Sequence, residues 1–344
     1  MPYGRAVEDS ASISQTTMTP FPKPRVLFSR CLTFEACRYN GQIIASEAVE
    51  QFKPLFENIT VCPEAEIGLG IPREPIRIVR EKGGFRLQQP ATGRDVSDKM
   101  RDFGRRFLDA LGPVDGFVLK GRSPSCGLTD VKVFAGTSKG SPLPGRTAGF
   151  FGQAVLERFP DIAVEDEGRL TNFVLREHFL TRVYATARFR LVLAEGSKRS
   201  AAGRLVRFHA ENKLLLMGYN QTKMRELGRL VANPEKQPAG EVLRAYGRLL
   251  GQALARPPRH ASAVNVLEHG YGYFKDRLTS REKTFFRNQL DSYRNRRVPL
   301  SVPQSIIRAW VERFDETYLA EQTFFRPYPE ELALISDSGK GREL

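Results

Sequence analysis

The chain has 344 residues, enough for about two domains, and its shares of hydrophobic residues (41%) and charged residues (27%) argue against a wholly disordered or fibrous protein. Lys and Arg outnumber Asp and Glu by 53 to 39, and this net charge of +14 favours anionic partners such as nucleic acid or nucleotides without identifying one. No apolar run approaches the roughly 20 residues of a membrane helix and the N-terminus has no signal-peptide pattern, so we expect a cytoplasmic protein without membrane contact.

The first half of the chain alternates short apolar runs with helical patterns. Residues 1–24 mix Ser, Thr, Pro and charged residues without periodicity, which predicts a flexible leader. Four short apolar runs then follow, at residues 26–28, 59–62, 76–79 and 116–119. A clear amphipathic helix over residues 97–111 lies between the last two runs. This alternation predicts an α/β domain with a parallel, Rossmann-like sheet and crossover helices.

The second half has a different pattern. After an apolar run at 131–134, Gly, Pro and Ser predict a loop over 135–146, followed by a helix over 151–159. Further on, most segments have helical spacing, namely residues 173–195, 204–217, 222–232, 239–255, 262–277 and 280–294. We therefore predict an all-α C-terminal domain over residues 170–335 and a disordered tail over 336–344.

The cysteines are confined to the first half, whereas all four histidines follow residue 177. The expected cytoplasmic compartment keeps thiols reduced, which argues against a disulfide framework for four cysteines in so long a chain. Cys31, Cys62 and Cys126 each follow a predicted strand, and because ligands gather beyond the carboxyl ends of parallel strands, these thiols are expected at one rim of the sheet. Three thiolates suit zinc or an iron-sulfur cubane with one open iron, while the alternative is that each cysteine is a small buried hydrophobic residue.

The residues that flank two of these cysteines also suggest chemistry. Residues 123–127 (SPSCG) have the composition of a tight loop whose backbone N–H groups point at an anion. Glu64 and Glu66 follow Cys62 directly and are candidates for general acid and base work. The alternative is that one of them forms an ion pair with Arg73 or Arg77.

Several separate motifs in this half resemble the 2-thiouracil desulfurase family. They are residues 29–32 (SRCL), 37–41 (CRYNG), 61–64 (VCPE), 68–73 (GLGIPR) and 120–127 (KGRSPSCG). The rest of the chain resembles a helical domain of unknown function that is often fused behind such a domain, through residues 205–209 (LVRFH), 213–217 (KLLLM), 227–231 (LGRLV) and 272–275 (GYFK). Together the two resemblances cover nearly the whole chain and predict a desulfurase domain over residues 25–165.

The resemblance implies a 4Fe-4S cluster held by Cys31, Cys62 and Cys126. Cys37 falls where the family pattern often has another residue, so we treat it as an accessory. The family pattern usually has Asp at the position of Asn40, and an asparagine can form hydrogen bonds but cannot act as a base at neutral pH.

The predicted function is non-redox removal of sulfur from a thiolated uracil-type base, converting 2-thiouracil to uracil and sulfide. The open iron is expected to act as a Lewis acid on the exocyclic sulfur while water attacks the ring carbon. Glu64 or Glu66 is the candidate general base, and Ser123 is the candidate for orienting the base or transferring a proton. Candidate substrate-binding residues are Ser29, Asn40 and Ser125. Arg73 and Lys120 are candidates for stabilising negative charge.

Two other functions fit the same sequence. The protein could be a basic module that binds nucleic acid or acts in its repair, with a structural metal site in place of a catalytic cluster. It could instead act on thiolated nucleosides in RNA, with the helical domain contacting the RNA.

Overall fold

The structure is a computed structural model that describes residues 20–333 apart from residues 139, 141 and 195–199. Most of the predicted leader, residues 1–19, and the predicted tail at 336–344 lie outside the described residues. No helix in the described part of the chain is long and apolar enough to cross a membrane.

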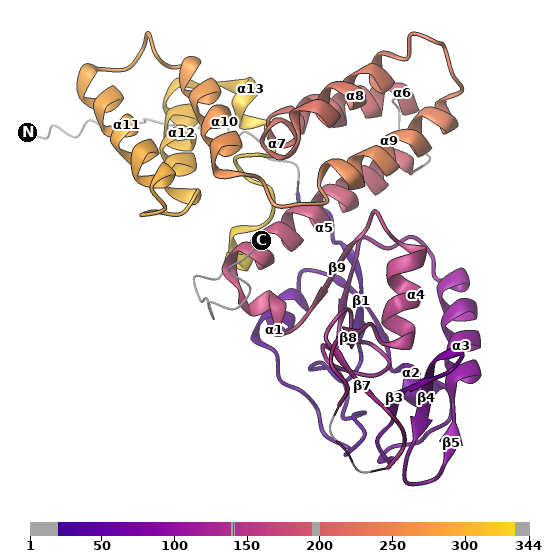
Figure 1. Cartoon of the computed structure of the whole chain (residues 1–344). Helices are drawn as coiled ribbons and strands as arrows, with labels where there is room; N and C mark the ends of the chain where they lie inside the picture. Colours follow the sequence, from indigo (N-terminus) through magenta and orange to yellow (C-terminus); the bar gives the residue numbers. More distant parts are fainter. Residues whose placement is uncertain (1–19, 139, 141, 195–199, 334–344) are drawn as a thin grey trace, which may run out of the picture.

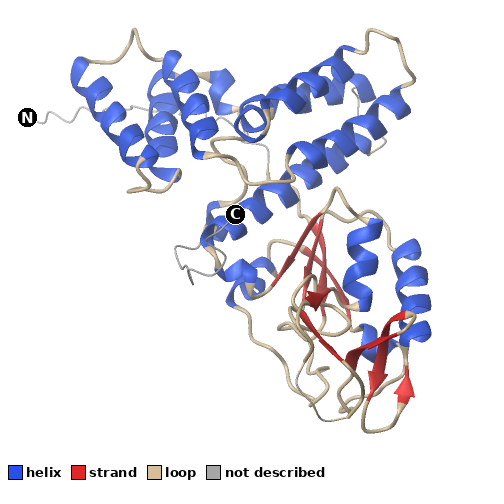
Figure 2. Ribbon diagram, viewed as in Figure 1, coloured by secondary structure: helices blue, strands red, loops and turns tan. Residues whose placement is uncertain are grey.

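The centre of the first half is a sheet of four parallel strands. In spatial order these are β2 (Glu57–Val61), β1 (Arg25–Ser29), β6 (Gly116–Leu119) and β9 (Ala163–Asp166). β1 and β6 are almost wholly buried, as expected for strands covered on both faces. The predicted α/β class with a parallel sheet is therefore confirmed (Figure 2).

A second, mixed sheet lies beside the first. Its five strands, in spatial order, are β5 (Arg94–Asp95), β4 (Gly84–Gln89), β3 (Arg77–Glu81), β7 (Val131–Phe134) and β8 (Arg146–Thr147). The apolar run at 76–79 belongs here and not to the parallel sheet, because β3 turns back through Gly83 and Gly84 and pairs antiparallel with β4. Gly84 has a φ of +120°, a backbone conformation that side chains other than glycine's rarely allow.

Helices cover both faces of the parallel sheet. Alternate residues of β1 point to opposite faces, so Leu27 packs against α3 (Ser97–Ala110) and α4 (Phe150–Arg158), whereas Val26 and Phe28 pack against α1 (Glu47–Phe52) and α5 (Phe173–Leu193). Figure 1 shows α3 and α4 side by side along one side of the sheet.

The rest of the described chain is mainly helical, as predicted. Its helices are α6 (Ala201–Glu211), α7 (Lys213–Tyr219), α8 (Gln221–Ala232), α9 (Ala239–Ala253), α10 (His260–Gly272), α11 (Ser280–Arg294), α12 (Ser301–Phe314) and α13 (Thr317–Ala320). One core joins α5, α6, α8 and α9, and another joins α7, α10, α11 and α12. The predicted helix over 204–217 is two helices, because the buried Asn212 side chain accepts a hydrogen bond from Thr323 and donates one to the Phe208 carbonyl.

The last residues that the structure describes return to the α/β half. Tyr328 and Leu332 pack in the same core as β1, α1 and α5, and the Tyr328 hydroxyl donates a hydrogen bond to Glu177 of α5. The segment that precedes them, through Phe324 and Phe325, packs among α10 and α12. The last described residues thus contribute to the cores of both halves.

Candidate active site

Residues with reactive or charged side chains follow all four strands of the parallel sheet. Cys31 lies two residues after β1, and Cys62 directly follows β2. Lys120 directly follows β6 and begins the loop that carries Cys126, while Glu167 directly follows β9. Because the carboxyl ends of parallel strands share one edge, the fold brings these residues to a single rim.

Among the three thiols expected to converge, Cys62 acts electrostatically on Cys31 and on Cys126. Burial and, to a smaller extent, the charge of Cys62 together raise the pKa of Cys31 to about 12. Burial likewise raises the pKa of Cys126, with further contributions from Cys31 and Cys62 and an opposing hydrogen bond with Ser29. None of the cysteines, all of which lie in the described part of the chain, forms a disulfide bond. Within that part, no three Cys, His, Asp or Glu side chains are close enough together to ligate a single metal ion.

Cys37, the fourth cysteine, lies against Cys62. The hydrogen bond from the Cys37 side chain lowers the pKa of Cys62, whereas burial raises it. The backbone N–H of Ala65 and the positive charge of Arg73 also lower this pKa. One guanidinium group holds both residues, since Arg73 Nη1 donates to the Cys37 carbonyl at 3.1 Å and Nη2 lies 3.8 Å from Cys62 Sγ. Cys37 is thus part of the immediate surroundings of a predicted cluster ligand.

Glu64 lies at the centre of a buried polar network. Its Oε2 accepts a hydrogen bond from Arg73 Nε at 2.8 Å, and its Oε1 accepts one from Ser125 Oγ at 2.6 Å. The side chains of Glu64 and Arg73 are 12% and 4% exposed, so this ion pair is shielded from solvent. The Ser123 and Ser125 hydroxyls are 2.9 Å apart, and the network therefore runs from the Cys126 loop to the guanidinium group that contacts Cys62.

The Cys126 loop is held by its own hydrogen bonds. The Ser123 hydroxyl accepts from the backbone N–H groups of Ser125 and Cys126, and the Ser123 carbonyl accepts from the Gly127 N–H. The expectation that these N–H groups point at an anion is therefore wrong, because the serine that begins the turn already satisfies them. Ser123 shapes this loop directly.

Glu167 is a candidate site residue that sequence reasoning missed. It forms an ion pair with Lys120, and its Oε2 accepts a hydrogen bond from the Gly121 N–H at 2.8 Å. Both charges act on the Cys31 thiol, where Lys120 lowers the pKa and Glu167 raises it. The available signal was the position of Glu167 directly after the short run Ala163–Asp166, which contains two acidic residues and was not recognised as a strand.

The remaining candidates differ in where the fold places them. Ser29 is buried, and its hydroxyl accepts a hydrogen bond from the Lys120 N–H at 2.9 Å, beside the thiols. Glu66 forms an ion pair with Arg30 at 2.7 Å and has a side chain that is 38% exposed. Asn40 lies in an exposed turn, where its amide group binds Gln42. Glu64 and the serines therefore lie in the network around the thiols, whereas Glu66 and Asn40 take other partners.

Two family models match the chain. The model described as 2-thiouracil desulfurase matches residues 26–167, and the model of a protein of unknown function, DUF1722, matches residues 213–329. The uncharacterized protein YbbK of Bacillus subtilis (strain 168) is 31% identical over 127 residues, which are 35% of this chain and 83% of YbbK. The chain belongs to the 2-thiouracil desulfurase family. Both resemblances predicted from the sequence are thereby confirmed.

Two further proteins are similar to this desulfurase-family chain. The uncharacterized protein YbgA of Escherichia coli (strain K12) is 27% identical over 151 residues, which are 44% of this chain and 88% of YbgA. Among solved structures, the 4Fe-4S-dependent thiouracil desulfidase TudS is 27% identical, with 43% of this chain and 93% of TudS covered and a TM-score of 0.34.

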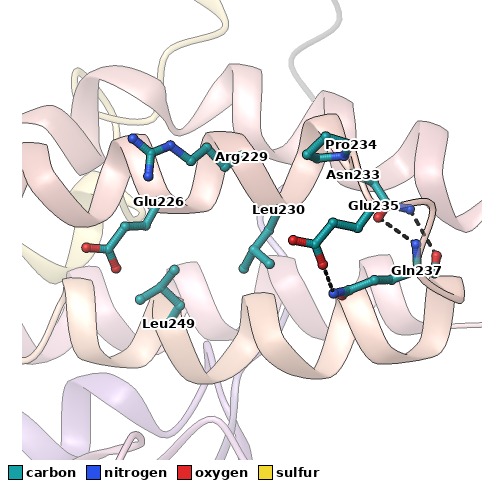
Figure 3. Close-up of a pocket in the computed structure, with 8 residues that line it drawn as sticks. All are labelled: Glu226, Arg229, Leu230, Asn233, Pro234, Glu235, Gln237 and Leu249. Carbon is teal, nitrogen blue, oxygen red and sulfur yellow. Dashed lines mark hydrogen bonds between the residues drawn. The ribbon is translucent and has the colours of Figure 1, made fainter.

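The desulfurase-family half has a groove beside the Cys126 loop. Its volume is about 600 Å³, and its lining includes Pro124 of that loop, Asp130 and four cationic side chains, namely Arg77, Arg122, Lys132 and Arg146. A smaller pocket of about 310 Å³ lies in the other half, between α8 and α9 (Figure 3). The lining of this smaller pocket combines Leu230 and Leu249 with Glu226 and Glu235, and it contains none of the candidate site residues.

Proposed function

We propose that this protein removes sulfur from a thiolated uracil-type base by hydrolysis, using a 4Fe-4S cluster held by Cys31, Cys62 and Cys126. Family membership supports the substrate class. The observation that carries the proposal is the position of the three thiols, which follow three neighbouring parallel strands, with Cys62 close enough to raise the pKa of both Cys31 and Cys126.

The chemistry of this donor set fits such a cluster. Three thiols without disulfide partners supply the sulfur ligands for three irons and leave the fourth iron without a protein ligand. When bound, the cluster would supply a Lewis acid that polarises the carbon–sulfur bond of the base. The work left to the protein is to position the substrate and water and to move protons.

Glu64 is the proposed general base. Its carboxylate is fixed by Arg73 on one oxygen and by Ser125 on the other, two residues from the ligand Cys62. A carboxylate held in this way takes a proton from the attacking water without having to change its conformation. The Ser125 and Ser123 hydroxyls, 2.9 Å apart, offer the proton a path away from Glu64. The Ser29 hydroxyl accepts a hydrogen bond from the Lys120 N–H and thereby positions the backbone at the start of the Cys126 loop.

Anaerobic reconstitution tests this proposal. The full chain is supplied with iron and sulfide, its iron content and visible absorption are measured, and conversion of 2-thiouracil to uracil and sulfide is followed by chromatography. We expect about four irons per chain and turnover that depends on them. A colourless protein that binds zinc and is inactive on every thiolated base would contradict the proposal and support the nucleic-acid-binding module with a structural metal.

The groove beside the Cys126 loop favours a second candidate substrate, a thiolated nucleotide or thiolated RNA. Its four cationic side chains outnumber its single carboxylate, Asp130, and suit a phosphate attached to the base. The test compares 2-thiouracil with its nucleoside monophosphate and with a thiolated oligonucleotide. If the groove binds phosphate, Lys132→Ala will raise KM for the phosphorylated substrates and leave KM for the free base unchanged.

A further inference from the structure

Cys37 is a buried nucleophile for which the proposed reaction has no use. It lies in the segment between β1 and α1, eight residues after the end of β1, and is fully buried. β1 and β2 are adjacent parallel strands, so the segments that follow them meet at the same edge of the sheet. Cys37 and Cys62 thereby become neighbours although 25 residues separate them in sequence.

The contact between these two residues is fixed from several directions. Cys62 Sγ donates a hydrogen bond to the Cys37 carbonyl oxygen at 3.7 Å, and the interaction with the Cys62 side chain raises the pKa of the Cys37 thiol. Arg73 clamps both residues through separate nitrogens of one guanidinium group. Cys31, by contrast, interacts with Cys62 through charge alone and has no hydrogen bond to it.

We propose that Cys37 and Cys62 form a reversible disulfide bond when the cluster is absent, so that oxidation blocks one cluster ligand and protects it from irreversible damage. The function assigned to this bond rests on the proposed role of Cys62 as a ligand. While Cys62 ligates iron its sulfur cannot join a disulfide, so cluster binding and disulfide formation exclude each other.

Hydrogen peroxide is a sufficient oxidant for the proposed bond. Cys62 keeps 7% of its surface exposed and Cys37 keeps none, so a small oxidant reaches Cys62 first. The Cys62 thiol and peroxide give a sulfenic acid and one water. The Cys37 sulfur then attacks Cys62 Sγ, the S–S bond forms as the S–O bond breaks, and hydroxide leaves with the Cys37 proton as a second water. Two thiols are oxidised by two electrons and one peroxide is reduced to two waters.

The experiment maps the thiols of the full chain without a cluster. Apoprotein is reduced, freed of reductant, treated with graded hydrogen peroxide, alkylated under denaturing conditions and digested. Cys31 and Cys37 lie on one tryptic peptide, residues 31–38, so a second cleavage after Glu35 is needed to tell them apart. We expect loss of two of the four thiols, a Cys37–Cys62 cross-link, and full recovery with dithiothreitol.

Two variants sharpen this result. Cys37→Ser removes the resolving thiol, so Cys62 should progress to sulfinic acid, which dithiothreitol does not reverse. Cys31→Ser is the matched control and should form the same cross-link as the unmodified chain. A Cys31–Cys62 cross-link, or no cross-link at peroxide concentrations that oxidise Cys62 in the Cys37→Ser variant, overturns the proposal. Resistance of every thiol at all concentrations overturns it as well.

Iron uptake gives an independent readout. After oxidation, the unmodified chain should bind iron only once dithiothreitol has been added, whereas oxidised Cys37→Ser should not recover. If the cross-link forms but no chain ever binds iron, the disulfide stands and the proposed cluster function fails. If iron binds normally but the cross-link never forms, only the disulfide proposal fails.

Discussion

Glu64 and Glu66 are two carboxylates on one short helix, α2 (Pro63–Glu66), with different surroundings. Residues two positions apart do not share a face of a helix. Glu64 accordingly lies in the buried network with Arg73 and Ser125, while Glu66 forms a surface ion pair with Arg30. Sequence alone left both as candidates for the general base, and their partners favour Glu64.

A pair of substitutions separates the two carboxylates. Glu64→Gln keeps the hydrogen-bond acceptor for Ser125 but removes the base, so kcat on 2-thiouracil should fall by about 100-fold or more with iron content unchanged. Glu66→Gln is the matched control, because it also removes one partner of an ion pair but at an exposed position, where such pairs contribute little. Equal losses in both variants, or none in either, would remove Glu64 from the proposed mechanism.

At this scale the sequence indicated that three thiols follow strands of the parallel sheet but did not indicate the side chains around them. Cys31, Cys62 and Cys126 were placed by one rule, that residues after parallel strands share an edge. The hydrogen bond between Ser125 and Glu64 joins residues 61 positions apart, and no local pattern encodes such a contact. Glu167 was missed because the strand before it is short and acidic.

At the scale of elements, α4 and the Cys126 loop are packed without any spare room. A Cβ atom on Gly152 would lie 2.3 Å from the Gly127 carbonyl oxygen and 2.8 Å from that of Cys126. Backbone cannot move aside as a flexible side chain can, so an alanine here would push the loop away from the helix. The glycine therefore sets the position of a predicted ligand.

We expect Gly152→Ala to lower the free energy of unfolding by about 1–3 kcal/mol, the usual cost of overpacking. Iron retention should fall with it, because the Cys126 loop shifts. Gly136→Ala is the control, since a Cβ atom at Gly136 meets nothing within 4 Å. Chemical denaturation and iron analysis of both variants measure the effect, and a Gly152→Ala protein as stable and iron-rich as the control would refute this account of the loop.

Elements with strong periodicity were predicted well and those shaped by distant contacts were not. The helix predicted over 280–294 matches α11, which begins with a capping box formed by Thr279 and Glu282. The strand β4 was missed because its apolar residues are few and its stability comes from pairing with β3. The break at Asn212 depends on Thr323, which is 111 residues away.

At the scale of the whole molecule, α5 belongs to the cores of both halves. Phe179 and Val183 pack with β1 and β6, whereas Phe189 and Val192 pack with α6 and α9. Arg190 also forms an ion pair at 3.0 Å with Asp115, which directly precedes β6 and whose side chain is 1% exposed. The domain boundary expected near residue 170 stays a prediction, and it falls directly before this shared helix.

Truncation on either side of α5 tests its contribution to the sheet. A chain of residues 20–168 loses the α5 side chains that cover one face, each worth about 1.5–3 kcal/mol of burial, and should be insoluble or unfolded. A chain of residues 20–194 keeps them and should give more folded protein, as measured by circular dichroism and size-exclusion chromatography. A stable, monomeric 20–168 chain would show that the sheet does not need α5.

The iron content of single cysteine variants tests the central claim most directly. Each of Cys31, Cys62 and Cys126 is replaced with Ser, Cys37→Ser serves as the control, and all chains are reconstituted anaerobically before iron and absorbance are measured. We predict that the three ligand variants lose the cluster or hold it unstably, while Cys37→Ser keeps about four irons per chain. Normal iron content in all three ligand variants would contradict the claim that these thiols hold a cluster.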